Sequence, residues 1–482
     1  MYNPFANICT PRVHRKDDVM KNALKALLAL MLALVMVLAS TACGDEYYYY
    51  DDDDDDDDEK TSQTDDENTK PTGGKVNPDD PTADVSIYKS TGTYATINDP
   101  LSWDGINAFP IKTTDMSIDE ARHLCVDFFR YSKTALWMPS DDFSYWHMKN
   151  AHDSGEPTNL NQQAGMVCGG LPYIYVASGS IYRLMDYMDP ATNVVNMADF
   201  QTNPHLYGNQ CSIGAYWGWA RVINSADYDW TQSMVESNGF LRVGNYEYDR
   251  YTPAWSDAYR TTDVLAENGK DKIFECYALL KAGDGIVYYT TAGHVVMISQ
   301  DALVVRYADG KIDPTQSYVT VIDQTPTESE SVNLYGDPYI YEKNVDAKWT
   351  FDKLFKGNYV PFTYKEFTGE DPIEETEYTL NHEGETITVE QMLKLKMTCN
   401  YGISDMYVSV YNANGVEVFK AVTRATQAGR MELKFTPSSN NYFEWGDETT
   451  LDPAKYEYTV KVYAQLGTGE RPVLWEGTLA AE

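Results

Sequence analysis

The sequence is poor in positive charge. Its 482 residues include 38 Lys and Arg against 73 Asp and Glu, which gives a formal net charge of −35 at pH 7. A chain this acidic is repelled by the phosphates of nucleic acids and by anionic lipid headgroups. We therefore expect no nucleic-acid partner and no electrostatic docking to a membrane.

The chain also lacks a paired cysteine framework. Its seven cysteines include no Cys-x-x-Cys pair; they are Cys9, Cys43, Cys125, Cys168, Cys211, Cys276 and Cys399. This spacing indicates neither a disulfide scaffold nor a zinc ribbon. A zinc site made of His205, Cys211 and His294 would also lack paired ligand spacing. We expect neither a metal nor an organic cofactor, and in an exported chain an unpaired thiol is a candidate nucleophile.

Near the N-terminus there is no apolar run long enough to span a bilayer. The apolar residues 26–38 follow the basic segment 21–25 and end in the small residues 39–42. This run is shorter than the about 20 residues of a transmembrane helix, and its layout is that of a cleaved secretory signal. We therefore expect an exported protein with residues 1–42 as its signal peptide.

Cys43, directly after this segment, resembles the lipobox cysteine of bacterial lipoproteins. In those proteins the cysteine is acylated and becomes the mature N-terminus, so the resemblance implies a lipid anchor on the outer face of the cell membrane. Ser40 stands where lipoboxes usually have Leu, Val or Ile, and an ordinary cleaved signal is the alternative. Residues 44–85 are acidic and almost free of aliphatic side chains, which predicts a disordered, extended stalk.

The expected fold class is α+β. In residues 86–366, the capping box 117–120 predicts the start of an amphipathic helix, and helical stretches continue to about residue 257. Four β-rich runs then predict an antiparallel meander. These runs are 285–289, 294–298, 302–307 and 318–323. A helical half followed by a meander is an α+β arrangement.

The last part of the chain predicts a separate all-β unit. Residues 367–376 are acidic and are expected to form a linker. Residues 377–482 alternate between polar and apolar side chains, with a hairpin-turn signal at 412–415. About six strands in this length predict an immunoglobulin-like β-sandwich. No titratable cluster occurs there, so a spacer or binding module is expected.

Three residues of the middle segment are candidates for one catalytic site. Cys211 opens a stretch of helical spacing, where free N–H groups and the helix dipole favour a thiolate. His294 opens an apolar strand after Gly283-Asp284-Gly285 and can act as a base if it faces Cys211. Asp323 ends the run 318–323 and can orient the imidazole, with Gln324 as the rival for this role.

At these residues the sequence resembles the NlpC-type and CHAP cysteine hydrolases of the bacterial cell wall. The resemblance implies a papain-like domain in which Cys211 is the nucleophile, His294 the base and Asp323 the orienting residue. The segment ending in Tyr173 is similar to the Gly-x-Pro-Tyr segment ahead of the nucleophile in the NlpC type. We expect Tyr173, Gln210 and Ser212 to contact the substrate.

These residues predict a cysteine peptidase or amidase that cleaves peptidoglycan or a cell-wall peptide. We expect a monomer that is attached to the membrane through Cys43. The alternative is a non-catalytic surface protein, used for adhesion or glycan binding and built on an inactive papain-like domain. Cys168 is a competing thiol, whereas Cys276 is expected in the core and His205 at the surface.

Overall fold

The structure, a computed structural model, describes the chain from residue 100 onward, with gaps. The described ranges are 100–141, 143–146, 159–162, 164, 168–173, 178–197, 208–224, 240–247, 260–290, 293–325, 344–436 and 441–481. The expected signal peptide (1–42), Cys43, the stalk (44–85) and His205 lie outside them. Within these ranges, no helix is long and apolar enough to cross a membrane.

The helices are short apart from α3. Their bounds are α2 (Trp103–Asn107), α3 (Ile118–Thr134), α4 (Ile181–Asp186), α6 (Cys211–Trp219), α8 (Thr261–Asn268), α9 (Lys270–Tyr277), α11 (Phe351–Lys356) and α12 (Val389–Met392), with a 3-10 turn η4 (Glu448–Thr450).

The strands before residue 370 are β1 (Leu136–Pro139), β2 (Phe143–Trp146), β3 (Asn159–Gln162), β4 (Cys168–Gly169), β5 (Met188–Asp189), β6 (Val194–Val195), β7 (Phe240–Arg242), β8 (Gly285–Tyr289), β9 (Gly293–Leu303), β10 (Tyr318–Ile322), β11 (Val345–Thr350) and β12 (Val360–Tyr364). Those after it are β13 (Tyr378–Leu380), β14 (Thr386–Ile387), β15 (Lys396–Cys399), β16 (Ile403–Asn412), β17 (Glu417–Ala425), β18 (Glu432–Lys434), β19 (Asn441–Trp445), β20 (Tyr458–Leu466) and β21 (Val473–Leu479).

Helix α3 begins where the capping box predicts. The Ser117 hydroxyl accepts a hydrogen bond from the Glu120 N–H at 3.3 Å, and the Glu120 carboxylate accepts one from the Ser117 N–H at 2.9 Å. Both bonds satisfy N–H groups that a helix start leaves without an intrahelical acceptor. The predicted start is therefore confirmed.

A six-stranded antiparallel sheet forms the middle of the molecule, in the order β11-β10-β9-β8-β12-β7. The meander predicted for this region is correct for β8, β9 and β10 but wrong for the third run. Residues 302–307 do not form a strand of their own, because β9 continues without a break to Leu303. Strand β12 then pairs with the free edge of β8, and β7 lies outside it.

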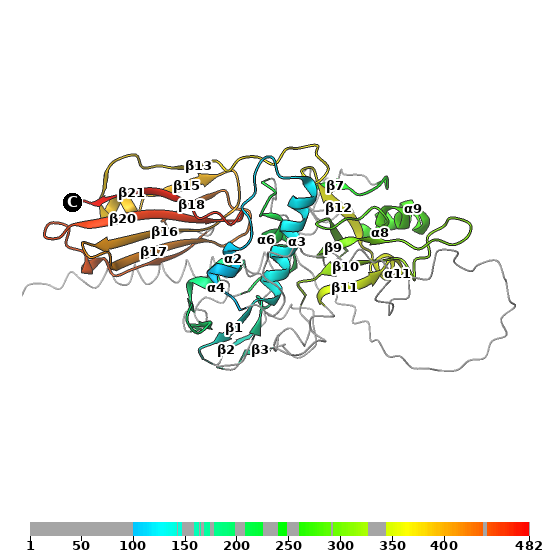
Figure 1. Cartoon of the computed structure of the whole chain (residues 1–482), viewed down its shortest axis with the longest axis horizontal. Coiled ribbons are helices and arrows are strands. Elements are labelled where there is room, and N and C mark those ends of the chain that lie inside the picture. Colours follow the sequence, from blue (N-terminus) through cyan, green and yellow to red (C-terminus); the bar gives the residue numbers. More distant parts are fainter. Residues whose placement is uncertain are drawn as a thin grey trace, which may run out of the picture.

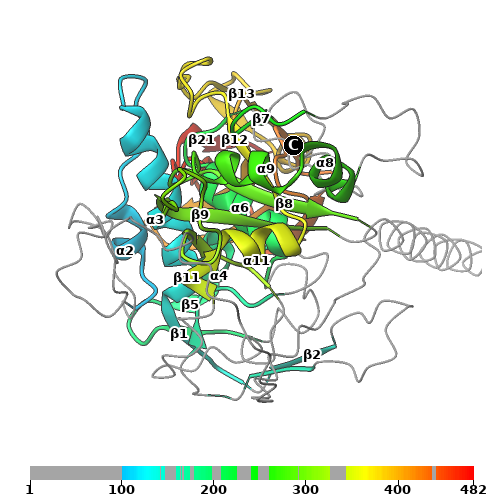
Figure 2. The same ribbon diagram turned by 90° about the vertical axis from the view of Figure 1, so that its right-hand side faces the viewer.

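Helices cover both faces of this sheet. In Figures 1 and 2, α3 and α6 lie on one side of β9, and α8, α9 and α11 lie on the other. On the first face, the Trp219 indole N–H donates to the Gly283 carbonyl at 2.8 Å. On the second, the Tyr277 hydroxyl donates to the Tyr359 carbonyl at 2.5 Å. The sheet is thus a central layer buried between two helical layers.

The Gly283-Asp284-Gly285 segment links α3 to the start of β8. Asp284 is buried and lies 2.7 Å from the Arg122 guanidinium of α3. Gly283 has φ +85°, a backbone conformation that favours glycine, and a Cβ on Gly285 would lie 2.1 Å from the Phe362 ring. Burial raises the pKa of Asp284, and the Arg122 charge opposes that shift. The motif therefore has a structural role.

The C-terminal region, residues 377–481, contains two further sheets around their own apolar core. One has three strands (β13-β15-β18) and the other has six (β14-β21-β20-β16-β17-β19). The predicted turn at 412–415 joins β16 to β17, where the Gly415 N–H donates to the Asn412 carbonyl at 2.9 Å and Gly415 has φ +74°. This hairpin prediction is confirmed.

The fold class expected from the sequence, a papain-like α+β domain followed by an immunoglobulin-like sandwich, is wrong. The described residues are 36% strand and 23% helix. The expected helical half contains seven of the strands, β1 to β7, several of them only two residues long. The C-terminal sheets have three and six strands, against the four and three of a constant-type immunoglobulin domain. Strands of two residues are too short to show a period-two pattern, so they could not be predicted from the sequence.

A cluster of buried charges joins α4 to the C-terminal region. Arg183 lies 3.0 Å from Asp405, and the two side chains are fully buried. Arg424 lies 2.9 Å from Asp186 and 3.2 Å from Asp405. The Tyr407 hydroxyl donates to Asp186 at 2.6 Å. Two cations and two anions therefore compensate one another where water is excluded.

Helix α6 also contacts the C-terminal region, through glycines that leave it room. A Cβ on Gly402 would lie 1.9 Å from the Tyr216 hydroxyl oxygen, and one on Gly467 would lie 2.8 Å from the Ala220 Cβ. Figure 1 shows α6 between the C-terminal sheets and the central sheet. The C-terminal region is therefore packed against the middle of the molecule.

We predict that Arg122→Ala lowers the free energy of unfolding by about 3–5 kcal/mol, because it leaves the buried Asp284 carboxylate without its cation. Urea denaturation followed by tryptophan fluorescence measures this change. The control is Lys396→Ala, which removes a half-exposed pair with Glu432 and should cost at most about 1 kcal/mol. Equal losses in the two variants would contradict the prediction.

Candidate active site

Cys211 is the first residue of α6. Gln210 is the N-cap residue, with extended backbone, and its carbonyl accepts from the Gly214 N–H at 2.8 Å. The Gln210 side chain does not cap the helix, and its amide lies 3.4 Å from the Ser212 hydroxyl. The Cys211 sulfur therefore lies at the end of α6 where free N–H groups and the positive pole of the helix are found.

The chain just before Cys211 is bonded to two neighbouring segments. Asn209 forms a parallel bridge with Tyr173 and an antiparallel bridge with Ser178. The Asn209 N–H donates to the Pro172 carbonyl at 3.2 Å. These bonds fix the path by which the chain enters α6.

Strand β9 supplies His294 and the end of β10 supplies Asp323. His294 is paired in register with Tyr288 of β8, and its ring centroid lies 6.2 Å from that of Tyr288. His294 Nε2 lies 2.8 Å from Asp323 Oδ1. The His294 ring also interacts with the Cys211 side chain, through charge and a side-chain hydrogen bond. Three distant segments thus meet at one point.

The two rivals for the third position have different partners. Asp323 contacts His294, whereas the Gln324 amide donates to the carbonyls of Leu171 and Asn209 and accepts from Lys133. The geometry therefore assigns the orienting position to Asp323.

The electrostatics of His294 favour the imidazolium. Burial acts to lower its pKa, because a charged ring is poorly solvated inside the protein. The charges of Asp323 and of the Cys211 thiolate, together with the hydrogen bonds from both, outweigh burial and hold the pKa well above its ordinary value of 6.5.

The other described cysteines are in surroundings that suppress reactivity. All are buried and none forms a disulfide. Burial raises the pKa of the Cys168 thiol to about 12, that of Cys399 to about 11, and also those of Cys125 and Cys276. Cys211 differs because it is placed beside a histidine and a helix N-terminus.

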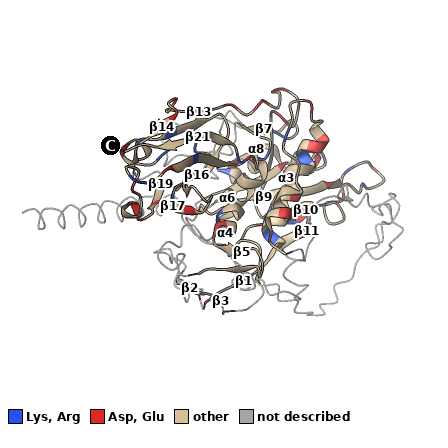
Figure 3. Ribbon diagram, turned by 60° about the vertical axis from the view of Figure 1, so that its left-hand side comes forward, with Lys and Arg blue, Asp and Glu red and all other residues tan. Residues whose placement is uncertain are grey.

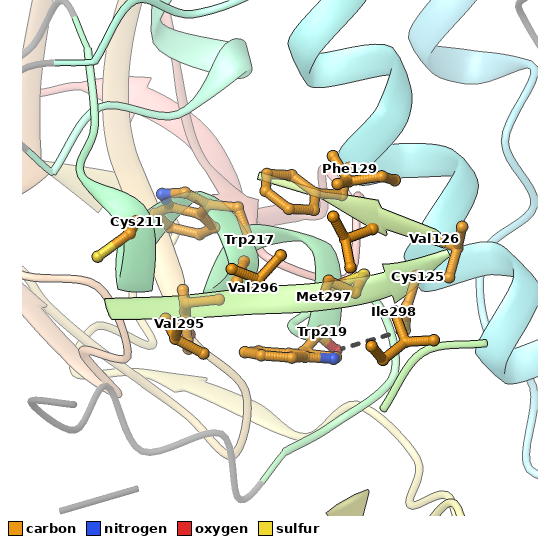
Figure 4. Packing of buried hydrophobic residues seen from close by; sticks show 14 of the residues in the cluster. Cys125, Val126, Phe129, Cys211, Trp217, Trp219, Val295, Val296, Met297 and Ile298 are labelled. Atoms are coloured by element: carbon orange, nitrogen blue, oxygen red, sulfur yellow. Dashed lines mark hydrogen bonds between the residues drawn. The ribbon is translucent and has the colours of Figure 1, made fainter. Parts of the chain in front are cut away.

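The residues expected to contact substrate surround Cys211 but are largely covered. Tyr173 is 8% exposed, Gln210 5% and Ser212 3%. In Figure 4, Trp217 and Trp219 pack against β9, and Cys211 lies at the edge of the apolar cluster. In Figure 3, α6 shows no charged residue along its length. The helix is therefore held by apolar packing.

No group of three or more His, Cys, Asp or Glu side chains in the described part of the chain is placed to hold a metal ion. The site does include a cation that the sequence analysis missed, the buried Lys133 of α3. Lys133 falls seven residues after Val126 and four after Phe129, which puts it on the apolar face of that helix. A lysine at such a position is the signal that could have revealed it.

We predict that Asp323→Asn lowers the pKa of His294, because it removes the strongest interaction that raises that pKa. A folded-state pKa above the unfolded value of about 6.5 adds stability that is complete below that pH and is lost as the pH rises through the folded-state pKa. The substitution should therefore cost most stability between about pH 5 and 6.5, and less at higher pH.

Denaturant midpoints of the two proteins across this range, with ¹³C-histidine NMR titration, measure both effects. A stability difference that grows as the pH rises would contradict the prediction.

Comparisons with known proteins add no family to this description. Neither a scan against models of known protein families nor a search of curated proteins finds a match to the chain. The assignment of the site therefore depends on the geometry of Cys211, His294 and Asp323.

Proposed function

We propose that this chain is an exported cysteine hydrolase that cleaves peptide or amide bonds of peptidoglycan. The observation that carries the proposal is that His294 contacts the Asp323 carboxylate and the Cys211 thiol at the same time. Nucleophile, base and orienting group in hydrogen-bonded order are the arrangement that activates a weak nucleophile. The arrangement is defined by geometry and recurs on unrelated folds, so it does not need a papain-like domain.

In the proposed reaction the Cys211 thiolate attacks the carbonyl carbon of the scissile bond. The N–H groups at the start of α6 stabilise the oxyanion. The His294 imidazolium gives its proton to the departing amine, which leaves an acyl-enzyme. Water, deprotonated by His294, then attacks the thioester, releases the acid and restores the thiolate and imidazolium. Asp323 holds the ring in position throughout.

The substrate class is proposed from two features of the sequence. The signal-like segment 1–42 indicates export, and the motifs around Cys211 and His294 resemble those of cell-wall hydrolases of the NlpC and CHAP types. A lipid on Cys43 and the acidic segment 44–85 would hold the site outside the membrane, within reach of the wall.

We predict that Cys211→Ala abolishes release of fragments from purified peptidoglycan. Loss of the nucleophile should lower the rate by at least about 10³-fold, and Asp323→Asn should lower it by a smaller factor. Mass spectrometry of the digest identifies the bond that is cleaved.

The matched control is Cys168→Ala, which removes the competing buried thiol and should leave the rate close to that of the unmodified chain. Wall digestion that survives Cys211→Ala would refute the thiol mechanism. Binding to the wall without any cleavage would instead favour the non-catalytic adhesion function.

The proposed anchor gives a separate prediction. In a bacterium fed a labelled fatty acid, the full chain should carry the label and fractionate with membranes, because acylation adds a buried hydrocarbon chain. The Cys43→Ser variant should carry no label, whereas Cys9→Ser should be labelled like the unmodified chain. A labelled Cys43→Ser protein, or an unlabelled full chain, would refute lipidation at this residue.

A further inference from the structure

Gln324 is hydrogen-bonded to three segments near Cys211. Its side-chain NH₂ donates to the Asn209 carbonyl at 3.1 Å and to the Leu171 carbonyl at 3.3 Å. Its carbonyl oxygen accepts from the Lys133 ammonium at 2.5 Å. The residue is 1% exposed, so water cannot replace these partners.

The position of Gln324 in the chain gives these bonds their significance. Its neighbour Asp323 bonds to His294, while Gln324 bonds to Asn209, two residues before Cys211. Two adjacent residues after β10 therefore bind both halves of the site: Asp323 bonds to the base, His294, and Gln324 bonds to the segment that leads into Cys211.

Lys133 fixes the direction in which the Gln324 amide points. An ammonium can only donate hydrogen bonds, so the amide oxygen must face Lys133 and the NH₂ must face the two carbonyls. The main chain of Lys133 packs closely against Gly170, which has φ +62° and where a Cβ would lie 2.3 Å from the Lys133 carbonyl carbon. If the Gln324 amide were rotated by 180°, its NH₂ group would face the Lys133 ammonium, and two donors would lie opposite each other.

Helix α6 makes room for this contact. A Cβ on Gly214 would lie 3.1 Å from both the Cβ and the Cγ of Gln324. Glycine costs helix stability in an interior position, and here it allows Gln324 to lie directly against the first turn of the Cys211 helix.

We propose that Gln324 is a positioning residue that sets the separation of Cys211 and His294, with Lys133 orienting its amide. This inference rests on the proposed function, because it takes Cys211 and His294 as the reacting pair. It assigns Gln324 no contact with substrate. Its effect is to keep the thiolate within reach of the imidazolium, on which the reactivity of the thiol depends.

The test is the rate at which iodoacetamide alkylates Cys211 in the full chain, followed by peptide mapping as a function of pH. Gln324→Met keeps the length of the side chain and removes all three hydrogen bonds. We expect the rate at pH 7 to fall about tenfold or more, and the pH profile to move to higher pH. The double variant Lys133→Met/Gln324→Met, which also removes the buried ammonium, should show the same loss of rate.

The matched control is Gln465→Met. Gln465 is also 1% exposed and its amide also donates to two main-chain carbonyls, those of Leu466 and Glu470, but it lies in the C-terminal region. A general loss of buried hydrogen bonds would change the unfolding midpoint in this variant as well, while its Cys211 alkylation should stay within about twofold of the unmodified chain.

Three results would overturn the proposal. The first is an unchanged alkylation rate and pH profile in a folded Gln324→Met protein. The second is an equal loss of rate in Gln465→Met. The third is that both Gln324 variants unfold while Gln465→Met stays folded, since the role would then be structural.

Because alkylation needs no substrate, this result is independent of the hydrolase test. If Gln324→Met slows the alkylation of Cys211 but the unmodified chain digests no peptidoglycan, the positioning role of Gln324 would stand and the proposed substrate would be refuted.

Discussion

The compensation of buried charge at the junction of α4 with the C-terminal sheets is the constraint on which the assembled molecule depends. Arg183 and Asp405 are fully removed from water, and the charge of either alone there would cost several kcal/mol. Neither can be buried unless the two parts of the chain are docked in one way. Arg424 and Asp186 add a second pair with the same requirement. The cluster therefore contributes more to the uniqueness of the arrangement than to its strength, since the desolvation of four charges offsets much of their attraction.

The contact between α4 and the C-terminal sheets is linked to the candidate site by a short series of backbone bonds. Arg183 donates to the Ser178 carbonyl at 3.2 Å, and Ser178 is bridged to Asn209 just ahead of Cys211. Gly402 and Gly467 also approach α6 closely, so the C-terminal region contacts this helix directly. The C-terminal region was expected to be a spacer or binding module, yet it forms one of the walls that hold the Cys211 helix. The other walls are α3 and β9, so the helix has little freedom to move relative to His294.

The sequence predicted local features better than their assembly. The capping box at Ser117 and the turn at 412–415 have strong short-range signals, and both are present. The candidate residues Cys211, His294 and Asp323 were found because each lies at the end of a helix or strand with a recognisable pattern. The sequence alone could not decide whether Asp323 or Gln324 contacts His294. The two residues are adjacent in the chain, and the side chain that faces His294 is determined by the tertiary structure. The two-residue strands escaped notice because their runs are too short to show a pattern. The buried pairs Arg183–Asp405 and Arg424–Asp186 escaped notice because the two partners are more than two hundred residues apart in the chain.

The order of strands in the central sheet affects when the candidate site can form during synthesis of the chain. Strand β7 has no neighbour in this sheet until β12, about 120 residues later, has been made, and β8 has a free edge until the same moment. Arg183 likewise cannot form its ion pair until Asp405 has been synthesised. Contacts of such long range form slowly, because loop closure must precede any gain from pairing. If the chain is exported from its N-terminus as proposed, it would emerge with its thiol separated from its base, and the pair would assemble only when nearly all of the protein has reached the far side of the membrane.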